Sequence, residues 1–163
     1  MNLLINSLYK SFRLSYFCIM NKFKSKNRDD VEFDFYWFKG KGEFLQPDSS
    51  NLIVDEFTVC PMEKAIKGIY TIQVLESDNE AKILSQTRDE GEGVKGMNIC
   101  EAMLPELYRH YTKNIISSSK SASTVPEESR VKKMTAIYER LEETGLVKYD
   151  DTRDVFIYPN VVS

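Results

Sequence analysis

Four segments of the chain have the length and residue types of β-strands. They cover residues 31–38, 52–60, 68–75 and 81–85. In the first segment, apolar residues from Val31 to Trp37 alternate with mainly polar ones, which is typical of a strand with one buried face. The other three are rich in Ile, Val, Phe, Tyr and Thr, and as three successive strands they predict an antiparallel sheet. The sequence Lys-Gly-Lys-Gly at 39–42 predicts a turn after the first strand.

A helical pattern follows residue 98. Its apolar face comprises Ile99, Ala102, Met103, Leu107, Tyr108 and Tyr111. Asn98 suits the N-cap of this helix. Pro105 interrupts the pattern, because a proline inside a helix costs about 3 kcal/mol. We therefore expect the helix either to kink or to begin near Leu104 with Pro105 in its first turn.

The remaining elements complete the predicted fold. Residues 114–119 predict a short strand, Pro126 suits the first turn of a second helix that ends at Gly145, and residues 146–149 and 155–158 predict a hairpin. Apolar spacing also predicts a first helix over residues 3–23. The expected class is α+β, with a central, mostly antiparallel, twisted sheet flanked by helices.

Composition indicates one globular domain with a basic start. The chain has 163 residues and a net charge of −3, but residues 1–28 contain six basic residues and no acidic one. We therefore divide the chain into a basic N-terminal extension, residues 1–28, helical or disordered, and a single domain, residues 29–163. The extension suits peripheral contact with a membrane surface or an anionic polymer, or is a solvated arm.

Cysteine and histidine usage narrows the chemistry. Cys18, Cys60 and Cys100 form no CxxC pair, and their odd number favours a reducing compartment, the cytoplasm. His110 is the one histidine, and no cluster has zinc spacing, so we expect no metal site. No stretch approaches the roughly 20 apolar residues of a membrane-spanning helix.

Residues 92–99, Glu-Gly-Val-Lys-Gly-Met-Asn-Ile, carry two glycines just before the predicted helix. Glycines let backbone N–H groups approach an anion closely, and a helix N-terminus adds partial positive charge. The loop therefore predicts a phosphate site. Glycines at such a junction also serve simply to turn the chain, and the loop alone does not separate the two interpretations.

The loop and the sequence after it resemble part of a known family. Residues 95–98, Lys-Gly-Met-Asn, are similar to the pyrophosphate loop Arg-x-x-Gly-x-Gly/Ala of GNAT-type, acetyl-CoA-dependent N-acetyltransferases. Residues 115–119, Ile-Ile-Ser-Ser-Ser, are similar to that family's splayed fifth strand, and residues 136–141 with Gly145 to its Ala-x-x-Tyr-x-x-Leu-Gly signature. Residues 93–158 thus resemble the acetyl-CoA-binding half of the family, in particular its small divergent members in phages and mobile elements.

The resemblance implies a GNAT-like acyltransferase fold that transfers an acetyl group from acetyl-CoA, as co-substrate, to an unidentified amine on a protein or small cationic molecule. The transfer would be a direct attack in a ternary complex. The implied pyrophosphate ligands are the backbone N–H groups of Val94, Lys95, Gly96, Met97, Asn98 and Ile99. The implied pantetheine ligands are Ile116, Ser117 and Ser118. Tyr138 would protonate the departing thiolate, although its helical spacing alone is typical of a core aromatic residue.

Three positions depart from the family pattern, one of them Lys133, which stands where many relatives have an asparagine before the Ala-x-x-Tyr. Gly93 stands where the family has arginine or glutamine, which removes a side-chain contact but no backbone donor. Asn98 stands where the family loop ends in glycine. Because asparagine adopts positive φ more readily than a β-branched residue, we expect the loop to survive this change.

A transferase of this type also needs a base for the ammonium proton of the acceptor. Asp55, Glu56 and Glu76 lie on or at the end of predicted central strands, and we choose Glu56. Each of the three also fits a solvated carboxylate on a strand face. Cys100 has no orienting partner, so we expect a core residue there and not a nucleophile.

Two other functions fit the same residues. A catalytically degenerate GNAT-like fold would bind a partner without turnover, in keeping with the altered loop. A helix followed by a hairpin, residues 127–158, also matches a winged-helix-like module. Residues 127–154 carry eight acidic and six basic side chains, which disfavours nucleic-acid binding.

Overall fold

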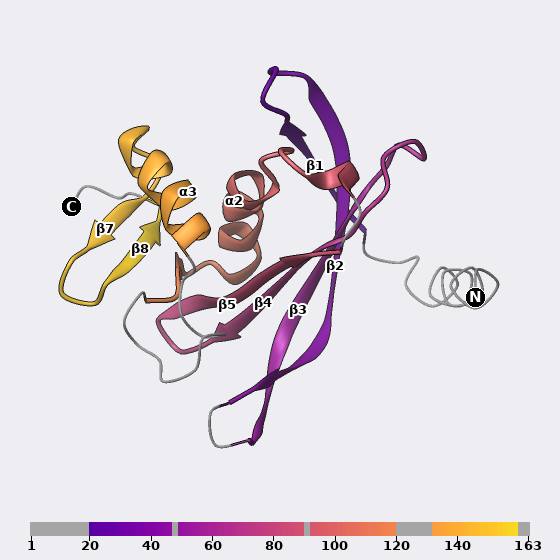
Figure 1. Ribbon diagram of the computed structural model, residues 1–163. Helices are drawn as coiled ribbons and strands as arrows, with labels where there is room; N and C mark the ends of the chain where they lie inside the picture. The colour runs from indigo at the N-terminus through magenta and orange to yellow at the C-terminus, as the bar shows by residue number, and fades with distance from the viewer. Residues whose placement is uncertain (1–19, 47–48, 90–91, 120–131, 160–163) are drawn as a thin grey trace.

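The computed structural model describes residues 20–46, 49–89, 92–119 and 132–159. They form an α+β fold with one open, mostly antiparallel sheet of eight strands and two α-helices (Figure 1). The strands are β1 (Asn21–Lys26), β2 (Glu32–Leu45), β3 (Asn51–Pro61), β4 (Tyr70–Glu76), β5 (Glu80–Arg88), β6 (Asn114–Ile116), β7 (Lys148–Asp150) and β8 (Val155–Tyr158). The helices are α2 (Ile99–Tyr111) and α3 (Lys132–Glu143), and the 3-10 turn η1 (Glu92–Val94) precedes α2. The predicted class is confirmed.

Strands β1 to β5 form an antiparallel meander in which each strand pairs with the next. The turn expected at residues 39–42 is wrong, because β2 continues to Leu45 and pairs with β3 throughout. Gly42 fits inside this strand for a steric reason: a Cβ there would lie 2.5 Å from Oε2 of Glu56 on β3. The helix expected over residues 3–23 is wrong for residues 21–23, which belong to strand β1. Residues 3–19 of that predicted helix lie outside the described residues.

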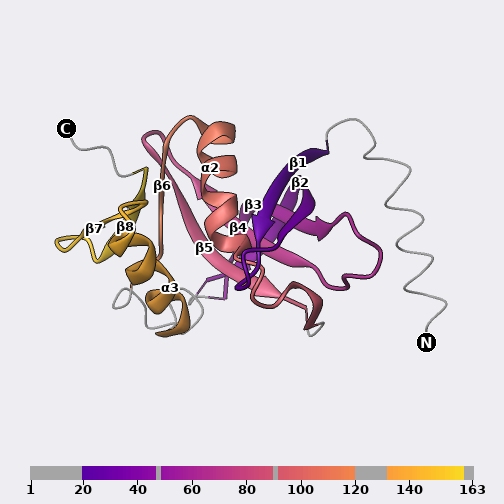
Figure 2. The ribbon, with the colours of Figure 1, turned by 90° about the horizontal axis from the view of Figure 1, so that it is seen from above.

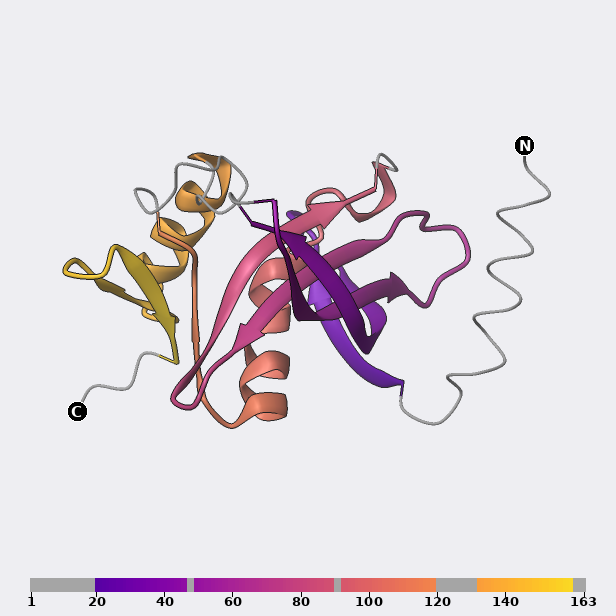
Figure 3. The ribbon, with the colours of Figure 1, turned by 90° about the horizontal axis from the view of Figure 1, so that it is seen from below.

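Beyond β5 the sheet changes from antiparallel to parallel pairing. Helix α2 connects β5 to β6, which is parallel to β5; β8 then pairs antiparallel with β6, and β7 pairs with β8. β5 and β6 pair only through residues 80–82 and 114–116, and then diverge while β5 continues to Arg88 (Figure 3). The strand predicted over residues 114–119 is therefore confirmed in place but ends at Ile116.

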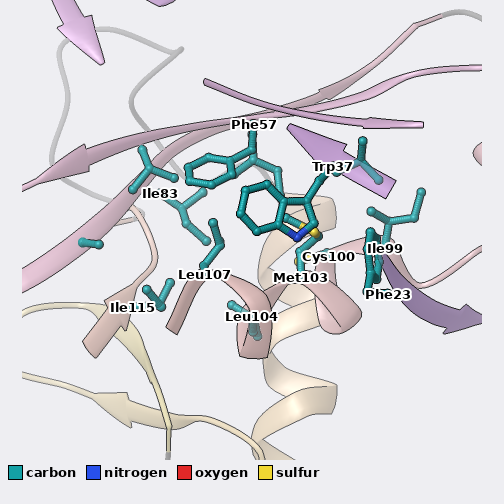
Figure 4. Close-up of a cluster of buried hydrophobic side chains, with 14 of the residues drawn as sticks. Phe23, Trp37, Phe57, Ile83, Ile99, Cys100, Met103, Leu104, Leu107 and Ile115 are labelled. Carbon is teal, nitrogen blue, oxygen red and sulfur yellow. The ribbon is translucent and has the colours of Figure 1, made fainter. Parts of the chain in front are cut away.

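The main core lies between α2 and one face of the sheet (Figure 2). Met103 and Leu107 of α2 are at most 1% exposed and pack in one cluster with Trp37 and Phe57 of β2 and β3 (Figure 4). Burial of each such side chain contributes about 1.5–3 kcal/mol. This packing explains why the register of β2 and β3 is fixed, since a slip of one residue would turn the aromatic rings to the other face.

Helix α2 begins at Ile99 and contains Pro105, so the alternative in which the helix begins near Leu104 is wrong. The two turns around Pro105 bury Met103, Leu104 and Leu107 almost completely. This burial offsets the backbone hydrogen bond that proline removes. The consequence is that the glycine loop leads directly into the N-terminus of a full-length helix.

Helix α3 and the final hairpin agree with the sequence prediction. Gly145 has a φ of 76° and forms the left-handed C-cap that ends α3. Asp150 Oδ1 accepts the N–H groups of two residues in the turn between β7 and β8. Tyr138 and Leu141 of α3 are buried in the main core. Pro126 lies outside the described residues, and neither described helix is long and apolar enough to cross a membrane.

Candidate functional site

The loop between η1 and α2 contains two residues with left-handed backbone. Gly96 has a φ of 74° and Asn98 a φ of 50°. The prediction that Asn98 replaces a glycine at positive φ is confirmed. Asn98 occupies the predicted N-cap position, but its side chain makes no capping bond and instead donates from Nδ2 to the carbonyl of Lys26 at 2.9 Å. Asn98 therefore fixes the loop to the end of β1.

Further contacts hold the loop against β1 and against the segment before β4. Ser25 Oγ donates a hydrogen bond to the carbonyl of Met97, and Val94 is 4% exposed. A Cβ on Gly93 would lie 1.9 Å from the carbonyl oxygen of Lys67. The departure at Gly93 thus has a structural cause, because neither arginine nor glutamine fits where the two backbones meet.

The same contacts leave donors uncommitted where α2 begins. Among the described residues, the N–H groups of Met97 and Ile99 have no acceptor. The first helical hydrogen bond of α2 is donated by the N–H of Ala102 to the Asn98 carbonyl at 3.1 Å. Such N–H groups carry partial positive charge. Arg28 lies beside the same loop, with Nε 3.8 Å from the position of a Cβ on Gly96. The loop therefore has both N–H donors and a nearby cation, which suits an anion.

The other predicted loop ligands differ in exposure. Lys95 is exposed, Gly96 is partly exposed, and Ile99 is 3% exposed in the core. The three heavy atoms nearest to the Gly96 Cβ position all belong to the side chain of Arg28 and lie 3.8–4.0 Å away. Only the backbone of Ile99 is thus in a position to contact a ligand, as the prediction requires.

The residues predicted to hold the pantetheine arm lie where β6 leaves β5. Ile116 pairs with strands on both sides, and the N–H of Ser117 donates to the carbonyl of Phe156 at 2.9 Å. Ser118 Oγ reaches across to β5 and donates to the carbonyl of Ile83 at 2.8 Å. The sheet therefore uses main-chain groups of Ile116 and Ser117, and the Ser118 hydroxyl bridges the two diverging strands.

Strand β5 is irregular at Leu84, beside Ser118. Its pairing with β4 shifts between Gln73 and Val74, opposite Leu84, and such a bulge interrupts the ladder and bends the strand. From Ile83 to Arg88, β5 has no partner strand on its β6 side among the described residues. Ser118 donates to the carbonyls of Ile83 and Leu84. Within the described ranges, the rest of this edge has no partner strand.

Tyr138 lies at the junction of α3, β5 and the first turn of α2. It is 3% exposed, and its ring stacks on Phe156 with the centroids 5.3 Å apart. Its hydroxyl accepts a hydrogen bond from Nε2 of Gln86 at 3.1 Å. Burial, together with the neighbouring Cys100 and Tyr70, raises the pKa of Tyr138 well above its ordinary value. The phenol therefore keeps its proton at neutral pH.

Cys100 is buried next to Tyr138 in the first turn of α2. Burial raises the pKa of its thiol to about 11. A neutral thiol is a weak nucleophile. The geometry is consistent with the expected core role for Cys100.

Glu56 lies on the other face of the sheet. Phe57, the next residue on β3, packs edge-on against His110 and Tyr111 of α2, so alternation directs Glu56 away from the helices. Its Oε2 accepts a hydrogen bond from Gln73 Nε2 at 3.0 Å. Two strands separate β3 from β6. The structure therefore does not bring Glu56 and Tyr138 together on one face.

The other two acidic candidates are paired with lysines. Asp55 is 5% exposed and accepts hydrogen bonds from Lys41 at 2.6 Å, Tyr111 at 2.8 Å and Lys39 at 3.1 Å. Burial opposes its charge, but these three bonds outweigh that effect and lower the pKa of Asp55. Glu76 pairs with Lys113 at 2.6 Å. Neither carboxylate is available as a base without displacing a cation.

Sequence reasoning missed Arg28, Gln86 and the Asp55 cluster. Lys39 and Lys41 are two residues apart on one strand face, and that spacing is a signal for a shared acidic partner. Arg28 follows β1, and no local pattern places it beside Gly96. In the described part of the chain, no group of three or more His, Cys, Asp or Glu side chains is placed to hold a metal ion. Comparison with protein-family models, curated proteins and solved structures finds no match.

Proposed function

We propose that this protein is an acetyl-CoA-dependent N-acetyltransferase of GNAT-like fold, acting on an amine acceptor in a ternary complex. The observation that carries the proposal is the unit of β5, the glycine loop, α2 and β6. A parallel strand pair that diverges beside a helix N-terminus is the common setting for phosphate-bearing ligands in sheets with βαβ units. The acetyl-CoA diphosphate would lie at the loop and its pantetheine arm along the open side of β5.

The loop has the chemistry that a diphosphate requires. Gly96 leaves space, the N–H groups of Met97 and Ile99 have no acceptor among the described residues, and Arg28 supplies a cation. Arg28 offsets the side-chain contact that is missing at Gly93. Charge-assisted hydrogen bonds of this kind contribute about 1.5–3 kcal/mol each.

Bound acetyl-CoA would supply an acyl group activated as a thioester. In the transfer, the amine nitrogen bonds to the carbonyl carbon and the carbon–sulfur bond breaks, giving an amide and a free thiol. The amine gives up a proton and the thiolate takes one. Tyr138 is our proposed donor because its hydroxyl is protonated and borders β5. Glu56 lies two strands from β5 and on the opposite face of the sheet, so we propose that solvent water, and not Glu56, accepts the amine proton.

A degenerate protein that binds acetyl-CoA without turnover is the second candidate. The burial of Tyr138 and the sheet contacts of Ile116 and Ser117 favour it. A nucleic-acid-binding wing is disfavoured, because Arg140 of α3 lies 3.5 Å from Glu101 of α2 and the apolar face of α3 is buried in the core.

Two measurements on the purified protein test the proposal. Isothermal titration with acetyl-CoA should show binding in the micromolar range, and no heat at high micromolar ligand would contradict any role for acetyl-CoA. Mass spectrometry of a set of amines incubated with protein and acetyl-CoA should then detect an acetylated product. Binding without product would support the degenerate form.

A further inference from the structure

Glu56 lies on the face of the sheet opposite α2 and pairs with no cation in the part of the chain that the structure describes. Among the described residues it forms no salt bridge, and its single hydrogen bond is the one that Oε2 accepts from Gln73. By contrast, its neighbour Asp55 on the helix face is bonded to two lysines. Glu56 is only partly buried, so Oε1 is left for an external donor.

The carboxylate is held in place from the side of β5. Ser85 Oγ donates to Oε1 of Gln73 at 2.9 Å, and Gln73 Nε2 donates to Glu56 at 3.0 Å. This chain crosses three neighbouring strands, β5, β4 and β3. A side chain whose partner is itself fixed is pre-organised for binding.

Two glycines of β2 make room beside Glu56. Gly42 lies under the carboxylate, with the Cβ position 2.5 Å from Oε2. Gly40, the residue paired with Glu56 across the strands, has no heavy atom within 4 Å of its Cβ position. Glycine inside a strand weakens it and marks a place where another group approaches closely. Gly42 is needed because a larger residue would clash with Glu56, but no described side chain fills the space above Gly40.

We infer that Glu56, with the open space above Gly40, binds a primary ammonium group of the acceptor on the face of the sheet opposite α2. The inference rests on the proposed function and names its substrate class. Two strand spacings, roughly 10 Å, separate β3 from β5, where the thioester would lie. The ammonium held by Glu56 is therefore a second cationic group and not the amine that reacts. Favoured acceptors carry two primary amines on one aliphatic chain, and Glu56 is a positioning residue.

Binding of 1,8-diaminooctane tests the site without acetyl-CoA. In a backbone amide NMR titration of the full chain, we expect saturable shifts at Gly40, Glu56 and Gln73. Glu56→Gln should lower the affinity about tenfold or more, the equivalent of one charge-assisted hydrogen bond. The matched control is Glu43→Gln, which removes the same charge from an exposed position on the other face of β2. Equal affinity in wild type and Glu56→Gln, or no saturable shift at these amides, would overturn the inference.

Gly40→Val separates a ligand site from a merely solvated carboxylate. Valine has high strand propensity and fills open space, so the variant should unfold at the temperature of the wild type or above it. Its affinity for the diamine should nevertheless fall by the same factor as in Glu56→Gln. Unchanged affinity in a folded Gly40→Val protein would contradict the site.

In turnover, the KM ratio of octylamine to 1,8-diaminooctane should be large in wild type and near one in Glu56→Gln. A ratio near one in both proteins would count against the second ammonium site. Failure of the proposed function is separate from failure of this site. If the diamine shifts the amide signals but acetyl-CoA does not bind, the ammonium site is supported and the proposed function is contradicted. If acetyl-CoA binds but the diamine causes no shifts, the loop site is supported and the ammonium site is contradicted.

Discussion

The hydroxyl of Tyr138 accepts a hydrogen bond from Nε2 of Gln86 at 3.1 Å. Oε1 of the same glutamine accepts one from the Tyr70 hydroxyl at 2.8 Å, so Gln86 is oriented by one tyrosine and donates to the other. The Tyr138 hydroxyl also forms a hydrogen bond with the Cys100 thiol, so it lies between Gln86 and the sulfur. To act as the proposed proton donor, the hydroxyl has to turn from Cys100 toward the departing thiolate.

Tyr138→Phe should therefore lower kcat while acetyl-CoA binding is kept. General acid catalysis contributes typically about 10²–10⁴-fold, so we expect at least a tenfold loss. Tyr70→Phe is the matched control, since it removes a hydroxyl from the same glutamine and should leave kcat within about threefold of wild type. Steady-state kinetics with free-thiol detection measures both. Equal kcat in Tyr138→Phe and wild type would exclude the acid role and leave Tyr138 as a core residue.

The pairing of Asp55 predicts a pH-dependent stability. Its folded pKa is lowered below the ordinary value of 3.8, so its contribution to stability is present above about pH 4 and is lost as pH falls through the folded pKa. Asp55→Asn should lower the free energy of unfolding at pH 7 by about 1–3 kcal/mol. The difference between the two proteins should shrink below pH 4. Urea unfolding at pH 7 and pH 3 measures this, and a constant difference would contradict it.

Gly93 should be the least replaceable glycine of the loop. A Cβ there would lie 1.9 Å from the Lys67 carbonyl oxygen, and backbone atoms on both sides have to move. We expect Gly93→Ala to lower the free energy of unfolding by more than about 2 kcal/mol, in the range of overpacked sites. Gly40→Ala, in open space, should be neutral or stabilising. Thermal unfolding of the two variants checks this, and similar midpoints would show that the loop follows a different path.

Arg28 should contribute to acetyl-CoA affinity through charge. Arg28→Gln is expected to raise the Kd about five- to tenfold, with a smaller effect at high salt. Lys22→Gln, an exposed change on β1, is the control and should leave the Kd unchanged. A matching change in both variants would indicate a general charge effect and not a contact at the loop.

Local patterns in the sequence predict most of the fold. Alternation identifies β2, residue composition identifies β3 to β5, and Gly145 marks the end of α3. These signals depend on neighbouring residues alone. The turn expected at Gly40 and Gly42 is wrong because β2 continues through both residues, and Gly42 leaves room for Glu56 on another strand. Helix α2 passes through Pro105 because tertiary burial exceeds the local cost.

The candidate site is predictable only in part. The glycine loop and the positive φ of Asn98 follow from residue types. The approach of Arg28 to Gly96 and the separation of Glu56 from Tyr138 depend on strand order and register, which no local pattern contains. The sequence does not show that Asp55 is committed to two lysines, because that requires knowing which face of β3 meets α2.

The central claim is that the loop before α2 binds the acetyl-CoA diphosphate, and two glycines of equal geometry test it. Gly96 and Gly145 have φ values of 74° and 76°, and in neither does a Cβ come closer than 3.8 Å to another described residue. Alanine at either position should cost a similar ~1 kcal/mol of backbone strain. Titration calorimetry with acetyl-CoA should show at least a tenfold weaker Kd in Gly96→Ala and the wild-type Kd in Gly145→Ala. Equal affinity in the two variants, or none in the wild type, would contradict the claim.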